Sequence, residues 1–159
     1  MWSVCKKELR QFFSSLTGYI AIIVFLLVNG LVLFVFDDNI LDFGYATLDR
    51  FFQLAPWILL LLIPAITMRS FAEEFKTGTW QIIVGKYLGS FIVVLIALLP
   101  TVIYIFSIQR LSSNEGLDMG ATVGSYIGLF FLAAVFTAIS ICCSSFTNNA
   151  VVAFIISLI

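Results

Sequence analysis

Four long apolar stretches divide the chain, at residues 17–36, 51–68, 87–108 and 123–143. Each runs about 18 to 22 residues without Asp, Glu, Lys, Arg or His. A helix rises about 1.5 Å per residue, so each stretch is long enough to cross the roughly 30 Å hydrocarbon core of a bilayer. The pattern predicts an all-α polytopic membrane protein in which residues 1–159 form a single transmembrane domain.

A fifth apolar stretch occupies residues 150–159. Ten residues are too few to cross a bilayer as a helix. We therefore expect four complete transmembrane helices plus a truncated fifth, and at least one further span in the full protein.

The basic residues predict the orientation of the spans. With the N-terminus inside, the inner segments hold six of the eight basic residues, namely Lys6, Lys7, Arg10, Arg69, Lys76 and Lys86. The outer loops hold only Arg50 and Arg110. Because basic residues concentrate in cytoplasmic segments, we expect a cytoplasmic N-terminus, with the aspartate-rich loop 37–50 on the outside.

Residues 1–15 mix aromatic and basic side chains. On a helical wheel the apolar set, Trp2, Cys5, Phe12, Phe13 and Leu16, leans to one side, and the basic set, Lys6, Lys7 and Arg10, leans to another. Such a segment is typical of an interfacial helix lying on the bilayer before the chain turns in. The alternative is a short solvated N-terminus.

The composition agrees with a membrane protein. Hydrophobic residues make up 62% of the chain and charged residues 11%, whereas a soluble domain carries about 25% charged residues. The net charge of −1 creates no field that would attract nucleic acid. An odd number of cysteines, three, with two adjacent, does not indicate a disulfide framework.

No residue pattern indicates an energy source or a catalytic centre within the chain. No apolar stretch holds an ionisable residue in its middle and the chain has no histidine, which disfavours proton coupling more strongly than sodium coupling. Residues 78–87 superficially resemble a phosphate loop, but six residues separate Gly78 from Gly85, and Tyr87 stands where the loop needs Ser or Thr. We therefore predict no catalytic, cofactor-binding or metal-binding residue, and no enzyme activity by the chain itself.

Glycines recur at helical spacing in two of the apolar stretches. Gly120, Gly124 and Gly128 form one stripe at the start of the fourth stretch, and Gly85 and Gly89 form another at the start of the third. Small residues let helix backbones approach closely in lipid, so both stripes predict helix packing. The partner is either a helix of this chain or one of another subunit.

Three prolines lie within the stretches, Pro56, Pro64 and Pro100. Each lacks a backbone donor and bends a helix, either as a static kink or as a hinge.

The polar segment 69–86 is the most specific feature on the predicted cytoplasmic side. Phe71 and Phe75 lie four residues apart among charged residues, and Gly78 is a suitable helix terminator. A short amphipathic helix of this kind docks into a groove of a soluble partner, although an ordinary solvated loop is the simpler alternative.

Four segments carry a family resemblance: KKELRQFFSSLTGYI, RSFAEEFKTGT, GKYLGS and GSYIGLFFLAAVFTAI. With them the whole chain resembles the permease subunit of ABC-2 type transporters, in particular the gliding-motility-associated permeases of Bacteroidetes. The resemblance implies six spans, a multi-pass place in the bacterial inner membrane, a separate ABC ATPase subunit, and a second permease copy or homologous subunit beside membrane lipids.

The same resemblance implies that Arg69, Glu73, Glu74, Gly78 and Thr79 belong to the segment that couples to the ATPase. The chain departs from the family here, because Thr79 runs directly into Trp80 without the apolar helix and proline that family members carry at this point.

We therefore expect a transmembrane permease subunit of an ATP-driven ABC exporter. Two alternatives remain, a non-transporting membrane scaffold for motility or secretion machinery and a sodium-coupled secondary carrier. An integral membrane enzyme is a more distant fourth.

Overall fold

The computed structural model describes residues 2–35, 48–72, 80–111, 117–146 and 149–158. Every regular element in these ranges is helical. The elements are α1 (Trp2–Ser14), α2 (Leu16–Phe34), α4 (Asp49–Ala72), α5 (Trp80–Leu98), the 3-10 turn η1 (Leu99–Thr101), α6 (Val102–Leu111), α7 (Met119–Ser144) and α8 (Ala150–Leu158). The expected all-α fold is confirmed for the described ranges.

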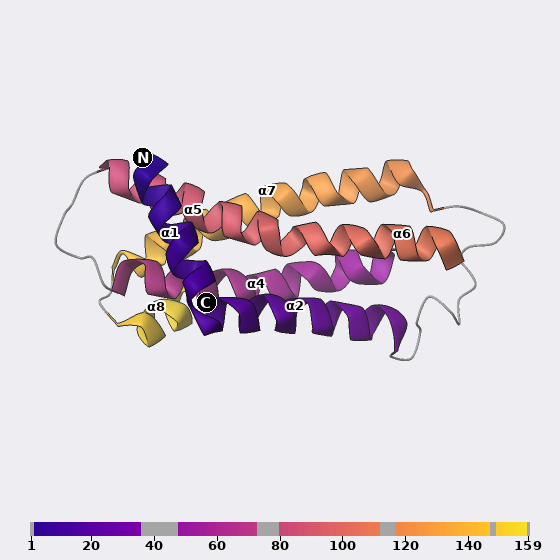
Figure 1. The fold of residues 1–159 in the computed structure, drawn as a ribbon, viewed down its shortest axis with the longest axis horizontal. Coiled ribbons are helices and arrows are strands. Elements are labelled where there is room, and N and C mark those ends of the chain that lie inside the picture. The colour runs from indigo at the N-terminus through magenta and orange to yellow at the C-terminus, as the bar shows by residue number, and fades with distance from the viewer. Residues whose placement is uncertain (1, 36–47, 73–79, 112–116, 147–148, 159) are drawn as a thin grey trace.

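The helices form an elongated bundle (Figure 1). Helices α2, α4 and α7 and the α5–η1–α6 unit run along its length, while α1 and the short α8 lie at one end. Helix α4 packs against α2, α5, α7 and α8, and so occupies the centre of the bundle. Helix α1 packs mainly against α5 and less against α2.

Three of the described helical segments are long and apolar enough to cross a membrane: Asp49–Thr67, Ile83–Arg110 and Met119–Ser144. A fourth is obtained if Trp2–Ser14 and Gly18–Phe34, which meet at a bend of 72°, are taken as one broken span. Three to four spans thus correspond to the four complete stretches expected from the sequence. The exact number and the orientation of the N-terminus stay predictions.

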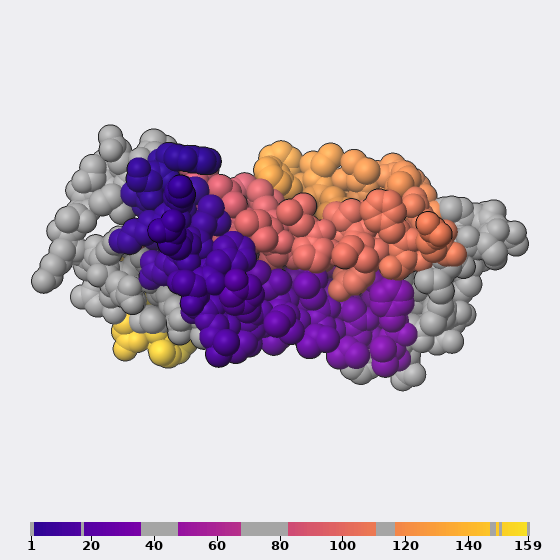
Figure 2. Space-filling model, in the orientation of Figure 1, coloured from indigo at the N-terminus to yellow at the C-terminus, as the bar shows by residue number. Residues whose placement is uncertain are grey.

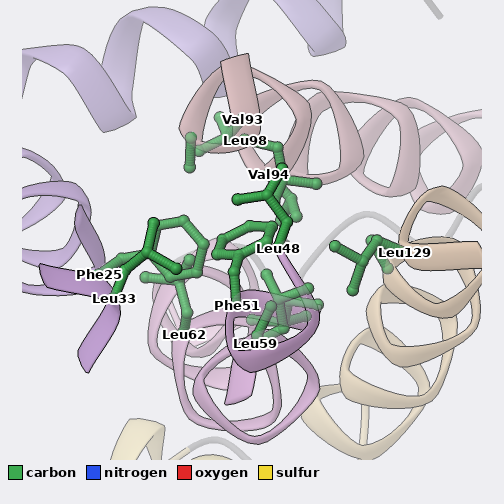
Figure 3. Close-up of a cluster of buried hydrophobic side chains, with 14 of the residues drawn as sticks. Phe25, Leu33, Leu48, Phe51, Leu59, Leu62, Val93, Val94, Leu98 and Leu129 are labelled. Carbon is green, nitrogen blue, oxygen red and sulfur yellow. The ribbon is translucent and has the colours of Figure 1, made fainter. Parts of the chain in front are cut away.

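Apolar side chains from four helices fill the centre of the bundle (Figure 3). The residues labelled there are Phe25 and Leu33 of α2, Leu48 just before α4, Phe51, Leu59 and Leu62 of α4, Val93, Val94 and Leu98 of α5, and Leu129 of α7. In a bilayer the surrounding lipid is as apolar as this core, so close packing rather than exclusion of water holds such helices together.

The prolines affect their helices differently. Pro100 lies in η1, so the Ile83–Arg110 segment changes from α-helical to 3-10 geometry there before continuing as α6. Pro56 and Pro64 lie inside α4, which remains one helix of 24 residues. Next to Pro64, the Thr67 hydroxyl donates to the carbonyl oxygen of Ile63 at 3.0 Å. The proline associated with a break is therefore Pro100.

Helix α7 begins earlier than the apolar stretch that predicts it. The Asp118 side chain caps the helix, since its Oδ1 accepts hydrogen bonds from the backbone of Gly120 at 2.9 Å and of Ala121 at 3.2 Å. These bonds satisfy two of the amide groups that the first turn of a helix leaves without partners. An acidic residue expected in a loop thus starts the helix.

Candidate functional site

The contact between α1 and α5 contains a buried ion pair. The Nζ of Lys86 on α5 lies 3.9 Å from Oε1 of Glu8 on α1, and the two side chains are only 1% and 11% exposed. Removing a charge from water is expensive, so a charge in such a place requires a partner of opposite sign. The pair joins the first helix of the chain to the beginning of the third apolar stretch.

A glycine brings the two helices close together beside this ion pair. A Cβ atom on Gly89 would lie 2.8 Å from Cβ of Glu8 and 3.6 Å from Cα of Cys5. Real Cβ atoms essentially never approach another atom to 2.8 Å, so a larger residue would push α1 away from α5. Gly85 and Gly89 are both buried, and Cys5 is buried as well.

The apolar residues that the helical wheel groups on one side of α1 differ in exposure in the structure. Cys5 is buried and Phe12 packs against the protein core, whereas Trp2 is 80% exposed. Residues 2–14 do form a helix, and its place at the surface of a bilayer stays a prediction. Packing against α5 takes up part of this side. The Gly85 and Gly89 stripe predicted a close helix contact but not that α1 is the partner.

A second cluster of polar atoms joins three helices farther along the bundle. The Thr101 hydroxyl is fully buried, donates to the carbonyl oxygen of Leu98 at 2.6 Å and lies 3.1 Å from the Tyr126 hydroxyl of α7. The Tyr104 hydroxyl of α6 donates to the carbonyl oxygen of Leu26 on α2 at 3.0 Å. The break at Pro100 is thus connected by hydrogen bonds to both α7 and α2.

Aromatic rings surround these hydroxyls. Phe51 of α4, which is 1% exposed, lies with its ring centroid 6.0 Å from that of Tyr104 and 6.0 Å from that of Tyr126. Phe52 meets Tyr126 edge-on at 5.1 Å. Aromatic pairs in this range attract one another by about 0.5–1.5 kcal/mol beyond their buried area. The cluster therefore closes the centre of this part of the bundle with rings from α4, α6 and α7.

Asn29 in the middle of α2 is the most polar buried side chain of that helix. It is 1% exposed, and its Nδ2 donates to the carbonyl oxygen of Phe25 at 2.7 Å. Its Oδ1 has no hydrogen-bond partner among the described residues, and the same holds for Oγ of buried Ser144 on α7. A buried polar atom without a partner costs about 1–3 kcal/mol.

Most of the residues expected to couple to an ATPase fall outside the described ranges. These are Glu73, Glu74, Gly78 and Thr79. Arg69 belongs to α4, but its side chain is also outside the described set. Their coupling role stays a prediction. Lys86, expected at the end of the same polar segment, instead lies inside α5 and is buried.

The glycine stripe of α7 faces away from the bundle. Gly120, Gly124 and Gly128 are exposed, and no described atom lies within 4 Å of a Cβ built on Gly124 or Gly128. The nearest neighbour of Gly120 is the Asp118 oxygen that caps the same helix, at 3.3 Å. Of the two stripes, Gly89 therefore packs against a helix of this chain, while the α7 stripe has no packing partner in the described chain.

Across the residues that the structure covers, no group of three or more His, Cys, Asp and Glu side chains could hold a metal ion. The buried ion pair and the hydroxyl cluster connect helices of the bundle.

Signals for these clusters exist in the sequence, but they are weak. Glu8 is the only acidic residue before residue 37, and Lys86 directly precedes an apolar stretch. Tyr104 and Tyr126 each place a hydroxyl within an apolar stretch, where a buried polar tip needs a hydrogen-bond partner. None of these signals says which residue the partner is.

The bundle defines the class of protein: an all-helical chain with three or four helices that could cross a membrane, consistent with a membrane protein. Comparison of the chain with protein-family models, with curated proteins and with solved structures found no match.

Proposed function

We propose that this chain is the transmembrane permease subunit of an ATP-driven ABC exporter in the bacterial inner membrane, associated with gliding motility. One observation carries the proposal. In the three segments that could cross a membrane, charged residues occur only near the ends: Asp49, Arg50, Lys86 and Arg110. Proton-coupled transporters place ionisable groups near the middle of the membrane. Their absence from the middle of these segments argues against proton coupling and supports an energy source in another subunit.

The family resemblance supplies that subunit, a separate ABC ATPase that contacts residues 69–86. ATP-driven closure of the ATPase pushes on this segment, which joins α4 to α5. Because α1 is attached to α5 through Glu8 and Lys86, α1 moves together with the beginning of α5. The helices then rock against one another, and a second permease copy or a homologous subunit completes the path.

Deletion of residues 73–79 tests the coupling step. We expect the shortened chain to reach the membrane but to lose co-purification with the ABC ATPase subunit that the family resemblance implies. Deletion of residues 112–116, which lie in the loop predicted on the opposite side of the membrane, is the matched control and should leave co-purification unchanged. Equal recovery of the ATPase with both deletions would argue against the proposal.

The sodium-coupled carrier is the second candidate, because the 3-10 turn η1 interrupts the α-helical geometry of the third span. At that turn the Leu98 carbonyl, the Thr101 hydroxyl and the Tyr126 hydroxyl come together, and groups of these kinds coordinate sodium in carriers with broken helices. Here these groups hydrogen-bond to one another, which favours the exporter.

Vesicles that contain the purified chain without any ATPase separate the two candidates. The exporter predicts no uphill movement of solute in these vesicles, with or without a sodium gradient. Sodium-driven uptake that is lost in Thr101→Val would establish the carrier instead.

A further inference from the structure

Helix α1 presents a line of three exposed side chains that lie outside its buried contact with α5. Trp2, Lys6 and Arg10 are spaced four residues apart, so they lie one above the other on the helix surface, and all three are exposed. We call them the α1 stripe. No ion pair of Lys6 or Arg10 is found in the portion of the chain that the structure describes.

The contact with α5 determines which way this stripe faces. Cys5, Glu8 and Phe12 occupy the other side of α1, where they meet α5 and the core. Glu8 is the only acidic residue of α1, and its charge faces Lys86 rather than the stripe. The exposed side of α1 is therefore cationic, with no acidic residue of the same helix to offset it.

The helix that carries the α1 stripe leads into a helix with an exposed apolar surface. Helix α1 meets the following helical segment at a bend of 72°, so it lies across one end of the bundle (Figure 2). Directly after the bend, α2 exposes Tyr19, Ile20 and Ile23. Tryptophan and basic residues beside an apolar surface are typical of the level of lipid headgroups.

We propose that Trp2, Lys6 and Arg10 form a binding stripe for the headgroups of anionic lipids. The ammonium of Lys6 and the guanidinium of Arg10 bind phosphate oxygens, and the guanidinium offers two parallel donors. The Trp2 indole has an apolar body and a polar N–H, which suits the boundary between acyl chains and headgroups.

The proposal goes beyond the exporter function and does not depend on it. We place lipid here rather than a soluble acidic protein, because α1 leads through the 72° bend into a helix that exposes large apolar side chains.

Binding of fluorescent lipids to the purified full chain in neutral detergent tests the proposal. Anisotropy is measured with a labelled phosphatidylglycerol and with the same label on phosphatidylcholine. Each basic residue near an anionic surface strengthens binding by roughly fivefold, so the double variant Lys6→Gln/Arg10→Gln should bind phosphatidylglycerol roughly 30-fold more weakly. Binding of phosphatidylcholine should be the same for both proteins.

Two control variants and the circular dichroism spectrum make the result specific. Arg110→Gln removes an exposed cation at the far end of α6 and should leave lipid binding unchanged. Lys6→Arg/Arg10→Lys keeps both charges and should retain most of the preference for phosphatidylglycerol. Both substituted positions are exposed, so the helical spectrum should not change in any variant.

Two outcomes would overturn the proposal. One is equal binding of phosphatidylglycerol and phosphatidylcholine by the unsubstituted chain. The stripe would then not recognise anionic headgroups, and a soluble acidic partner would be the better explanation of its charge. The other is a loss of phosphatidylglycerol binding in Arg110→Gln as large as in the double variant. Lipid binding would then depend on the net charge of the protein and not on the α1 stripe.

Discussion

Single residues connect the helices of this bundle at two places. Lys86 meets Glu8 where α1 crosses α5, and Thr101 meets Tyr126 where the third span breaks. Both pairs consist of polar groups inside an otherwise apolar protein, where losing a partner is more costly than at a surface. They are the positions at which a small chemical change should have a large effect.

Lys86→Met should lower the free energy of unfolding by about 3 kcal/mol, because it removes one charge of a buried pair and leaves the other charge in place. The double variant Glu8→Gln/Lys86→Met removes both charges and should recover most of this loss. Thermal unfolding of the purified chain in detergent, followed by circular dichroism, measures the effect. Lys6→Met at an exposed position of α1 is the control. An equal loss of stability in this control would contradict the conclusion that Lys86 and Glu8 form a stabilising buried pair.

Thr101→Val and Tyr126→Phe should show coupled effects on stability, because their hydroxyls lie 3.1 Å apart. Hydrogen bonds between helices in membranes contribute about 0.6 kcal/mol on average, so we expect a coupling energy of about that size in a double-mutant cycle. The cycle of Thr101→Val with Tyr104→Phe is the comparison, since the Tyr104 hydroxyl donates to the Leu26 carbonyl instead. Strictly additive losses in the first cycle would show that the two hydroxyls do not interact.

At the scale of elements, identical spacing of small residues has two different outcomes. Gly89 provides the close contact between α5 and α1, while Gly124 and Gly128 face away from the described bundle. A stripe of glycines predicts that a helix can be approached closely, but it does not say by which helix. The difference arises because α1 crosses α5 and no described helix crosses the corresponding face of α7.

Gly89→Ala and Gly124→Ala should therefore change stability in opposite directions. An added methyl group at residue 89 collides with Glu8 and should cost about 1–3 kcal/mol, as overpacking does. At residue 124 the methyl group meets open space, and alanine should stabilise the helix by about 0.5–1 kcal/mol. The same thermal unfolding assay compares the two variants. A clear destabilisation by Gly124→Ala in the isolated chain would mean that this face of α7 is covered.

At the scale of the whole molecule, α4 is the centre around which the other helices pack. Its residues from Phe51 to Ile66 contribute much of the core, and α2, α5, α7 and α8 surround it. The Glu8–Lys86 pair lies between α1 and α5, and α5 contacts α4. The Thr101–Tyr126 pair lies between η1 and α7, and α7 also contacts α4.

The orientation of this bundle in the membrane gives the last prediction. Native cysteines are first replaced in the variant Cys5→Ala/Cys142→Ser/Cys143→Ser. Single cysteines are then introduced as Ser3→Cys or Ser113→Cys. The positive-inside pattern predicts that a membrane-impermeant maleimide labels Ser113→Cys in intact cells and Ser3→Cys only after the membrane is permeabilised. Labelling in the reverse order would invert the topology and move residues 69–86 away from any cytoplasmic ATPase.

The length and purity of the apolar stretches by themselves determined the class of fold. In lipid, each backbone polar group must find its partner within its own helix or a closed sheet, so a stretch of 20 apolar residues has few alternatives to a helix. That constraint is local, and for this reason residues 51–68, 87–108 and 123–143 could be placed on helices without any knowledge of their neighbours.

The tertiary structure alone decided which faces of these helices meet. Glu8 and Lys86, or Tyr104 and the Leu26 carbonyl, are far apart in the chain, and an apolar helix satisfies its own backbone equally well in any rotation about its axis. Close packing at Gly89 and the pairing of a few buried polar groups select one rotation among many. The helical wheel already placed Lys6 and Arg10 on one side of α1, but only the tertiary structure showed that both side chains are exposed and that Cys5 and Glu8 meet α5.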